Sequence, residues 1–210
     1  TIGGQKLDDL QQADAVKEAG TGYRKLTLAG TDVKPQMGKV EVKNNNKTIA
    51  WGAMYWQYFE QLDQITSAST GVKIKKQLFL QKASAKGDVL TPLMANNVLA
   101  PGDLLKVRIE IVCDRNMEYI HLKDMRSSGF EPVNVISQYK YQDGLGYYES
   151  TKDASTNFFI SYVRKGTYVF EYPLRVTHAG NFSNGITTLQ SMYAPEFTTH
   201  SAGIRVNVKP

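Results

Sequence analysis

The chain has 210 residues and a mass of 23.5 kDa, enough for one large or two modest domains with a sizeable core. Its residues are 41% hydrophobic and 21% charged, with 12 Tyr, 8 Phe and 2 Trp, which is typical of a folded protein and excludes a disordered chain. The net charge of +5 comes from basic and acidic residues spread along the sequence, without a basic run longer than two residues. Nucleic-acid binding is therefore not favoured.

The single cysteine, Cys113, excludes an intramolecular disulfide and a thiolate zinc cluster, and it does not assign a redox compartment. No apolar stretch approaches the roughly 20 residues of a membrane span. The first residues, Thr1-Ile2-Gly3-Gly4, include neither an initiator Met nor an apolar signal segment. We therefore expect the chain to be part of a longer protein.

The N-terminal third carries strand patterns and one ambiguous segment. Residues 6–19 are compatible with a helix, because Leu7 and Leu10 are three apart, but their second half is equally compatible with a strand. Residues 38–43 and 49–59 are predicted strands, joined by a polar loop. The second has bulky side chains at both parities, which is typical of a strand covered on both faces.

A polar segment of mostly small residues, 63–71, predicts a linker between two units. We place the domain boundary there, which gives units of residues 1–71 and 72–210.

The strongest strand pattern follows a turn at Pro101-Gly102-Asp103, where Leu105, Val107, Ile109 and Ile111 alternate with charged residues. Two later stretches alternate in the same way, 168–176 and 204–208. Together they predict an all-β fold, an antiparallel β-sandwich, preceded by a smaller β-rich unit.

Asn184-Gly185 lies between Phe182 and Ile186 and predicts a β-hairpin with a type I′ turn, because both central positions of that turn need a positive φ.

Motifs for catalysis are weak, and we expect no enzyme activity. His121 and Asp124 could form an acid/base pair, but residues three apart on a strand point to opposite faces. Cys113 ends a strand, where a free thiol more often packs than reacts. No serine lies in a Gly-x-Ser-x-Gly elbow. We therefore predict no catalytic, cofactor-binding or metal-binding residue, and no cofactor.

Three further patterns have a structural interpretation as well as a functional one. Gly144-Leu145-Gly146 resembles the start of a phosphate loop, but no third glycine or P-loop lysine follows, so a bend is favoured. The carboxylates of Asp143, Glu149 and Asp153 could supply oxygens to calcium, but they lack the spacing of a dedicated loop. The sequons at Asn46 and Asn181 lie in predicted surface loops and matter only if the source organism glycosylates.

Four tyrosines surround Asp143-Gly144 and could form a platform on which a sugar stacks, since a Tyr ring has an apolar face and a polar tip. The favoured interpretation is that they are alternating core residues beside an ordered loop. They are Tyr139, Tyr141, Tyr147 and Tyr148.

Long strings of the sequence resemble a known family. Residues 50–60, Ala-Trp-Gly-Ala-Met-Tyr-Trp-Gln-Tyr-Phe-Glu, are similar to the segment that follows the thioester-type helical domain in bacterial alpha-2-macroglobulin-like proteins, especially the long envelope versions of the Bacteroides group. Residues 117–126, 129–134, 143–150 and 165–197 resemble the final macroglobulin-like domain of that family. The resemblance covers nearly the whole chain, with weak support over residues 1–20.

The resemblance implies that residues 1–71 are the closing half of a CUB-like β-rich unit that flanks the helical domain. Residues 72–210 would form the C-terminal macroglobulin-like β-sandwich. The family traps or inhibits proteases, in some members through a thioester, but the motif Cys-Gly-Glu-Gln does not occur in this chain. The resemblance thus implies a non-catalytic structural part of a protease-inhibiting parent in the cell envelope, in the periplasm or on its extracellular face.

The same resemblance implies particular partners, and two alternative functions stay open. The expected partners are the helical and other macroglobulin domains of the parent chain, and host or competitor proteases through the parent, without nucleic acid or direct membrane insertion. The alternative is a standalone carbohydrate- or protein-binding β-sandwich module, which requires an exposed tyrosine row. An enzyme would require a pocket around His121 and Asp124.

Overall fold

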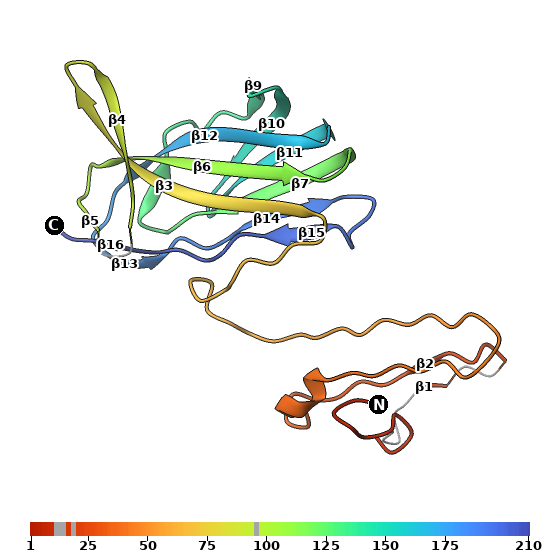
Figure 1. The fold of residues 1–210 in the computed structure, drawn as a ribbon. Coiled ribbons are helices and arrows are strands. Elements are labelled where there is room, and N and C mark those ends of the chain that lie inside the picture. The colour runs from red at the N-terminus through yellow and green to blue at the C-terminus, as the bar shows by residue number, and fades with distance from the viewer. Residues whose placement is uncertain (11–15, 18–19, 95–96) are drawn as a thin grey trace. The chain divides into compact units, whose positions relative to one another are not determined.

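A computed structural model describes residues 1–10, 16–17, 20–94 and 97–210, without the side chains of residues 16–17. The chain divides into two compact units, Thr1–Gln57 and Tyr58–Pro210. Most of the regular structure lies in the second unit, as β-strands packed face to face (Figure 1). No helix in the described part of the chain is long and apolar enough to cross a membrane. The predicted all-β fold is confirmed.

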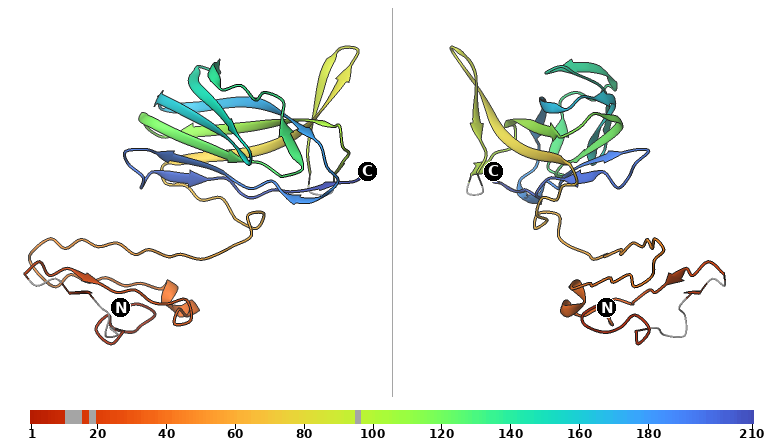
Figure 2. Two further views of the ribbon diagram at one scale, coloured as in Figure 1. Left: turned by 180° about the vertical axis from the view of Figure 1, so that it is seen from behind. Right: turned by 45° about the vertical axis from the view of Figure 1, so that its right-hand side comes forward.

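The second unit is a β-sandwich of two antiparallel sheets with a smaller sheet at one end (Figures 1 and 2). The six-stranded sheet has the order β15 (Thr198–His200), β14 (Thr187–Ser191), β7 (Met117–Met125), β11 (Ser155–Val163), β10 (Leu145–Lys152), β9 (Gln138–Gln142). The five-stranded sheet has the order β4 (Gly87–Pro92), β3 (Val72–Ser84), β6 (Leu104–Cys113), β12 (Gly166–Val176), β8 (Phe130–Pro132). The small sheet is β13 (Gly180–Ser183), β16 (Arg205–Val208) and β5 (Val98–Leu99), with β16 and β5 parallel.

The core forms where the alternating strands turn their apolar faces toward the opposite sheet. All ten residues of β6 alternate between half-buried and buried positions, as the period of two predicts. The central pair of the core is Phe158 of β11 and Phe170 of β12, whose ring centroids lie 4.9 Å apart at 63°. This edge-to-face contact joins the two sheets, and such pairs contribute about 0.5–1.5 kcal/mol beyond area burial.

The predicted hairpin at Asn184-Gly185 is wrong. Its flanking strands belong to different sheets: β13 pairs with β16, and β14 pairs with β7 and β15. The backbone N–H of Asn184 donates to the carbonyl of Ile204 at 2.8 Å, and Gly185 has a φ of +66°. The positive φ that this dipeptide permits is therefore used to cross between sheets.

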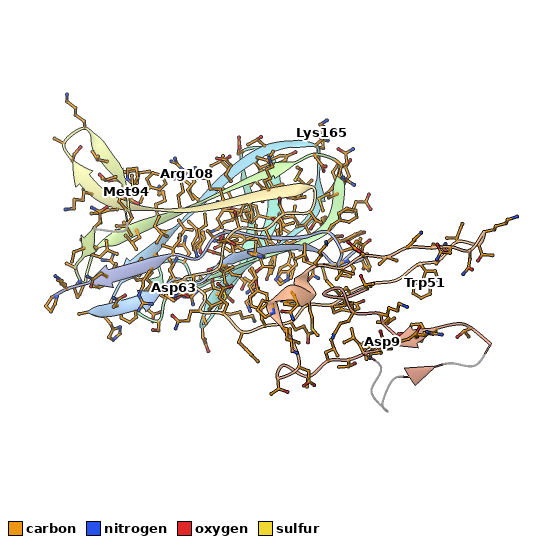
Figure 3. The ribbon with its side chains drawn as sticks, turned by 60° about the horizontal axis from the view of Figure 1, so that its bottom comes forward. Asp9, Trp51, Asp63, Met94, Arg108 and Lys165 are labelled. Atoms are coloured by element: carbon orange, nitrogen blue, oxygen red, sulfur yellow. The ribbon has the colours of Figure 1, made fainter. Side chains whose placement is uncertain are left out.

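The segment 63–71 lies against the sandwich and is not a free linker. Ala68 and His200 exchange backbone hydrogen bonds of 3.2 and 2.9 Å, and the N–H of Gly203 donates to the carbonyl of Ile65 at 2.9 Å. Asp63, labelled in Figure 3, forms an ion pair of 3.0 Å with Arg205. The segment thus covers the backbone edge of β15, which would otherwise be an open edge strand.

The first unit contains little regular structure. β1 (Val16–Lys17) pairs with β2 (Arg24–Lys25), and a 3-10 turn, η1, spans Pro35–Gly38. Of the ambiguous segment 6–19, Val16–Lys17 is a strand, whereas residues 11–15 and 18–19 lie outside the described residues. Met37 is the buried hydrophobic residue among the described residues of this unit. One side chain makes no hydrophobic core, so packing within this unit contributes little stability.

The predicted strands at 38–43 and 49–59 are not formed. Residues 39–43 contribute one isolated bridge, between Ile2 and Val40, and residues 49–59 are extended without a ladder. All of residues 49–59 are exposed, including Trp56 at 48% and Trp51, labelled in Figure 3. A strand pattern needs a neighbouring strand to pair with, and the described part of the chain offers none here.

Candidate functional site

A buried ion pair lies between the two sheets. The Lys76 ammonium of β3 is 2.7 Å from Asp124 Oδ1 of β7, and both side chains are almost completely buried. Lys76 Nζ also donates to the carbonyl of Met125 at 2.7 Å and to that of Asn184 at 3.2 Å. Its three protons therefore meet three acceptors, which is the arrangement that makes a buried charge tolerable.

Two hydroxyl groups complete the surroundings of the Asp124 carboxylate. Thr187 of β14 donates to Oδ1 at 2.6 Å, and Tyr172 of β12 donates to Oδ2. Burial raises the pKa of Tyr172 well above its usual value, helped by the negative charge of Asp124, so this hydroxyl keeps its proton. Burial lowers the pKa of Lys76, and the nearby Asp124 opposes that change. We call these four side chains, Lys76, Asp124, Tyr172 and Thr187, the inter-sheet network.

The inter-sheet network can hold the sheets in register but cannot perform acid/base chemistry on a ligand. Its four members come from four strands, two in each sheet, and none is open to solvent. Sequence reasoning missed Lys76. The signal was present, because Lys76 shares its parity on β3 with Ile74 and Leu78 and thus faces the core.

His121 and Asp124 do not form a dyad. They lie on opposite faces of β7, as their spacing predicted, with Asp124 inside and His121 outside. His121 Nε2 is 2.9 Å from Asn157 Oδ1, and its ring stacks on Phe159 at 4.8 Å and 8°. The enzyme interpretation thus loses the one acid/base pair that the sequence suggested.

The remaining candidates for chemistry have structural partners. Cys113 is buried, and burial raises the pKa of its thiol to about 11, which suits packing. Asp143 accepts the backbone N–H of Val169 at 2.8 Å, and Glu149 forms an ion pair of 2.7 Å with Lys140. Asp153 follows the opposite end of β10 from Asp143. Over the described residues, no group of three His, Cys, Asp or Glu side chains could hold a metal ion.

Gly144-Leu145-Gly146 belongs to a tight hairpin and not to a phosphate loop. Asp143 and Gly144 have φ of +49° and +76°, and Gln142 pairs with Leu145, so two residues connect β9 to β10. Positive φ at both central positions is the mark of a type I′ turn.

The two sequons differ in their surroundings. Asn46 lies in an exposed bend, as predicted. Asn181 lies in strand β13 and not in a loop, and its Oδ1 accepts a hydrogen bond of 2.7 Å from Arg205 Nε.

The four tyrosines around the hairpin separate into two groups. Tyr147 is buried in the core, 5.5 Å from Phe158 between ring centroids, so the core interpretation holds for this residue. Tyr139 and Tyr141 are exposed at 83% and 75%, and Tyr148 is half-buried beside Tyr139 with ring centroids 4.9 Å apart.

A second exposed apolar surface lies on the outer face of the six-stranded sheet. It consists of Tyr119, Phe159, Met192 and Tyr193, which we call the Tyr119 surface. The rings of Tyr119 and Tyr193 meet edge to face at 5.1 Å. A hollow of about 70 Å³ opens between Tyr119, Phe159, Ser161 and Met192. Exposed apolar surface gathered in this way is typical of an interaction site.

The backbone at Tyr119, within this surface, is strained. Its φ is +51°, in the left-handed region that a bulky residue rarely adopts, and the ladder to β11 skips this position. The Tyr119 carbonyl accepts the N–H of Met192 at 2.9 Å, which fixes the turn after β14. Such strain costs about 1–3 kcal/mol and concentrates at functional positions.

Comparison with known families covers most of the sandwich. The family model described as the bacterial alpha-2-macroglobulin MG10 domain matches residues 71–196, more than half of the chain. The chain belongs to this family. The matched region of the MG10 domain begins one residue before β3 and contains the inter-sheet network and the Tyr119 surface. The predicted family is thereby confirmed.

Solved structures show the same fold as the MG10 domain. Salmonella alpha-2-macroglobulin reacted with methylamine aligns with a TM-score of 0.54 and 19% identity over 70% of this chain and 10% of that chain. Escherichia coli alpha-2-macroglobulin activated by porcine elastase aligns at 0.56 and 16% over 70% and 14%, and its native conformation at 0.54 and 15% over 74% and 10%. The aligned part of this chain therefore covers between a tenth and a seventh of these three macroglobulin chains. No functionally curated protein matches it.

Proposed function

We propose that this chain is a non-catalytic structural part of a longer alpha-2-macroglobulin-like protein that inhibits proteases by trapping them in the cell envelope. The observation that carries the proposal is the Tyr119 surface, an exposed apolar area on an otherwise well-packed domain of this family. Its partner is the helical domain of the parent chain, which the MG10 sandwich contacts and whose thioester, where one exists, it covers.

The mechanism is a switch in contacts. Cleavage of the parent by a protease changes the relative free energies of two arrangements of its domains. A domain contributes to this difference only if its contacts differ between the two arrangements. The Tyr119 surface supplies such contacts, because the side chains of Met192 and Tyr193 are 57% and 80% exposed and lose that exposure when a domain docks. The inter-sheet network keeps the sheet beneath them rigid.

Residues 1–71 would complete a β-rich, CUB-like unit together with parts of the parent that lie outside this chain. The support is that this part of the chain exposes most of its bulky apolar side chains: Met37 is buried, whereas Trp51, Tyr55 and Phe59 are exposed on an extended segment. Bulky residues at both parities would be covered when this segment becomes an inner strand.

The test uses the full parent protein with Met192→Ala and Tyr193→Ala combined. We expect hydrogen exchange at 117–121 and 190–194 to be slow in the uncleaved parent and faster after protease cleavage. The double variant should exchange fast in both states and inhibit proteolysis of a protein substrate less. Val89→Ala, at an exposed apolar residue of the other sheet, is the matched control. Equal exchange before and after cleavage would refute the docking role.

A further inference from the structure

The hairpin of β9 and β10 presents two exposed tyrosines on one face. β9 is the terminal strand of the six-stranded sheet (Figure 1), and Tyr139 and Tyr141 are two apart, so their side chains share a face. That face points away from the core, because Lys140 between them turns inward to Glu149. The same outer face carries the Tyr119 surface: Tyr148, the cross-strand partner of Tyr139, pairs on its other side with Phe159, so the two tyrosines continue that surface toward the edge at β9.

The Tyr141 ring lies across the glycines of the hairpin. Its cross-strand partner is Gly146. A Cβ atom at Gly146 would lie 3.8 Å from Tyr141 Cδ2, and one at Gly144 would lie 3.9 Å from the Tyr141 hydroxyl oxygen. One side of the ring therefore rests on backbone without side chains, and the rest of the ring stays 75% exposed. The hairpin glycines and the Tyr141 ring are therefore neighbours on this face.

Side chains also hold the hairpin in place. The Gln142 amide donates to the carbonyl of Glu171 at 3.2 Å and accepts its N–H at 2.9 Å. Asp143 Oδ2 accepts the N–H of Val169 at 2.8 Å. These hydrogen bonds use backbone groups of β12 outside the stretch 174–176, which pairs with β8. They attach the hairpin to the five-stranded sheet. A surface fixed before binding loses less entropy when a ligand arrives.

The chemistry of this face fits an uncharged ligand. The outward positions of β9 and of the paired part of β10 are Tyr139, Tyr141, Gly146 and Tyr148, and none carries a charge. A β-linked unit with the gluco configuration has only equatorial substituents, so it offers an apolar face of axial C–H groups and a rim of polar substituents. A Tyr ring matches both, with an apolar face and a polar tip.

We propose that Tyr139 and Tyr141 form a stacking platform for a neutral, β-linked glycan chain. This binding goes beyond the proposed protease-trap role and does not depend on it. It would attach the domain to polysaccharide of the envelope or of a neighbouring cell, with the two rings contributing most of the affinity and Tyr148 extending the surface.

The test is a titration of the 210-residue chain with cellohexaose and with chitohexaose, followed by amide NMR. We expect saturable shifts confined to residues 138–148 with at least one of the two sugars. Tyr141→Ala should weaken binding about tenfold or more, whereas Tyr141→Phe should retain most of it, because stacking needs the ring and not the hydroxyl. Tyr162→Ala, at another exposed tyrosine of the same sheet, should bind as the unaltered chain does.

Three outcomes would overturn the platform. The first is no saturable shift with either sugar, and the second is an equal loss of affinity in Tyr141→Ala and Tyr162→Ala. The third is protection of residues 138–142 from hydrogen exchange in the parent without added glycan, which would assign this face to a protein contact. Unfolding midpoints of the variants, measured alongside, separate lost binding from lost folding. Because the protease-trap test uses 117–121 and 190–194, either proposal can fail without the other.

Discussion

The inter-sheet network makes a quantitative prediction about stability. Asp124→Asn keeps the shape of the side chain but removes the charge that faces the Lys76 ammonium at 2.7 Å. A buried charge that loses its partner typically costs about 3–5 kcal/mol. For a unit the size of Tyr58–Pro210, 1 kcal/mol corresponds to about 2–4 °C, so the thermal midpoint should fall by about 6–20 °C.

A double variant separates the ion pair from the packing. Lys76→Met combined with Asp124→Asn removes both charges, and a buried ion pair replaced by neutral groups is often close to neutral in stability. We expect the double variant to recover more than half of the loss, as measured by urea unfolding with circular dichroism. Lys75→Met, on the exposed face of the same strand, is the control and should change the free energy of unfolding by less than about 0.5 kcal/mol. Simple additivity of the two single losses would refute the coupling.

Three further results are expected from unfolding experiments. Because burial raises the pKa of Cys113 from 9.0 to about 11, stability should fall as the pH rises through that window, and Cys113→Ala should flatten the fall; a slope unchanged by the substitution would contradict the assignment. Gln142→Ala removes the side-chain amide that bonds both backbone groups of Glu171, and it should lower the free energy of unfolding in urea by about 1–3 kcal/mol. Tyr139→Ala, on the same strand but with its side chain facing outward, is the control and should lower it less. Trp56→Ala should leave the thermal midpoint of this chain within about 1 °C, because the side chain is 48% exposed, but should lower that of the parent; a large drop in the isolated chain would mean that the segment is packed.

The exposed segment 49–59 shows where a strand pattern misleads. Its side chains are those of an inner strand, and strand propensity expresses how well a residue fits a pleated, half-buried surface. That surface must come from neighbouring strands. No described residue of this chain provides it, so the segment stays extended and exposed. The same reasoning explains Asn184-Gly185, where local turn chemistry was correct but the partners of β13 and β14 lie elsewhere in the sheets.

The functional features were only partly visible in the sequence. The opposite orientation of His121 and Asp124 followed from their spacing. For the four tyrosines the core interpretation was favoured, and it is right for Tyr147 but wrong for the exposed Tyr139 and Tyr141. The Tyr119 surface was not anticipated. Its members come from three places in the chain, β7, β11 and the turn after β14, and only pairing of these strands brings them together.

Local patterns were sufficient for the features that depend on neighbours along the chain. Alternation with a period of two fixed the strands β6, β12 and β16 and the side of each that faces the core, because successive side chains of a strand point in opposite directions. The sequence also identified the family through long matching strings. Tertiary structure alone decided which strands are neighbours, and thereby that Lys76 meets Asp124 across the sandwich and that Tyr141 rests on Gly146. The reason is physical: a contact between residues far apart in sequence is set by packing and hydrogen bonding of whole sheets, which no local pattern specifies.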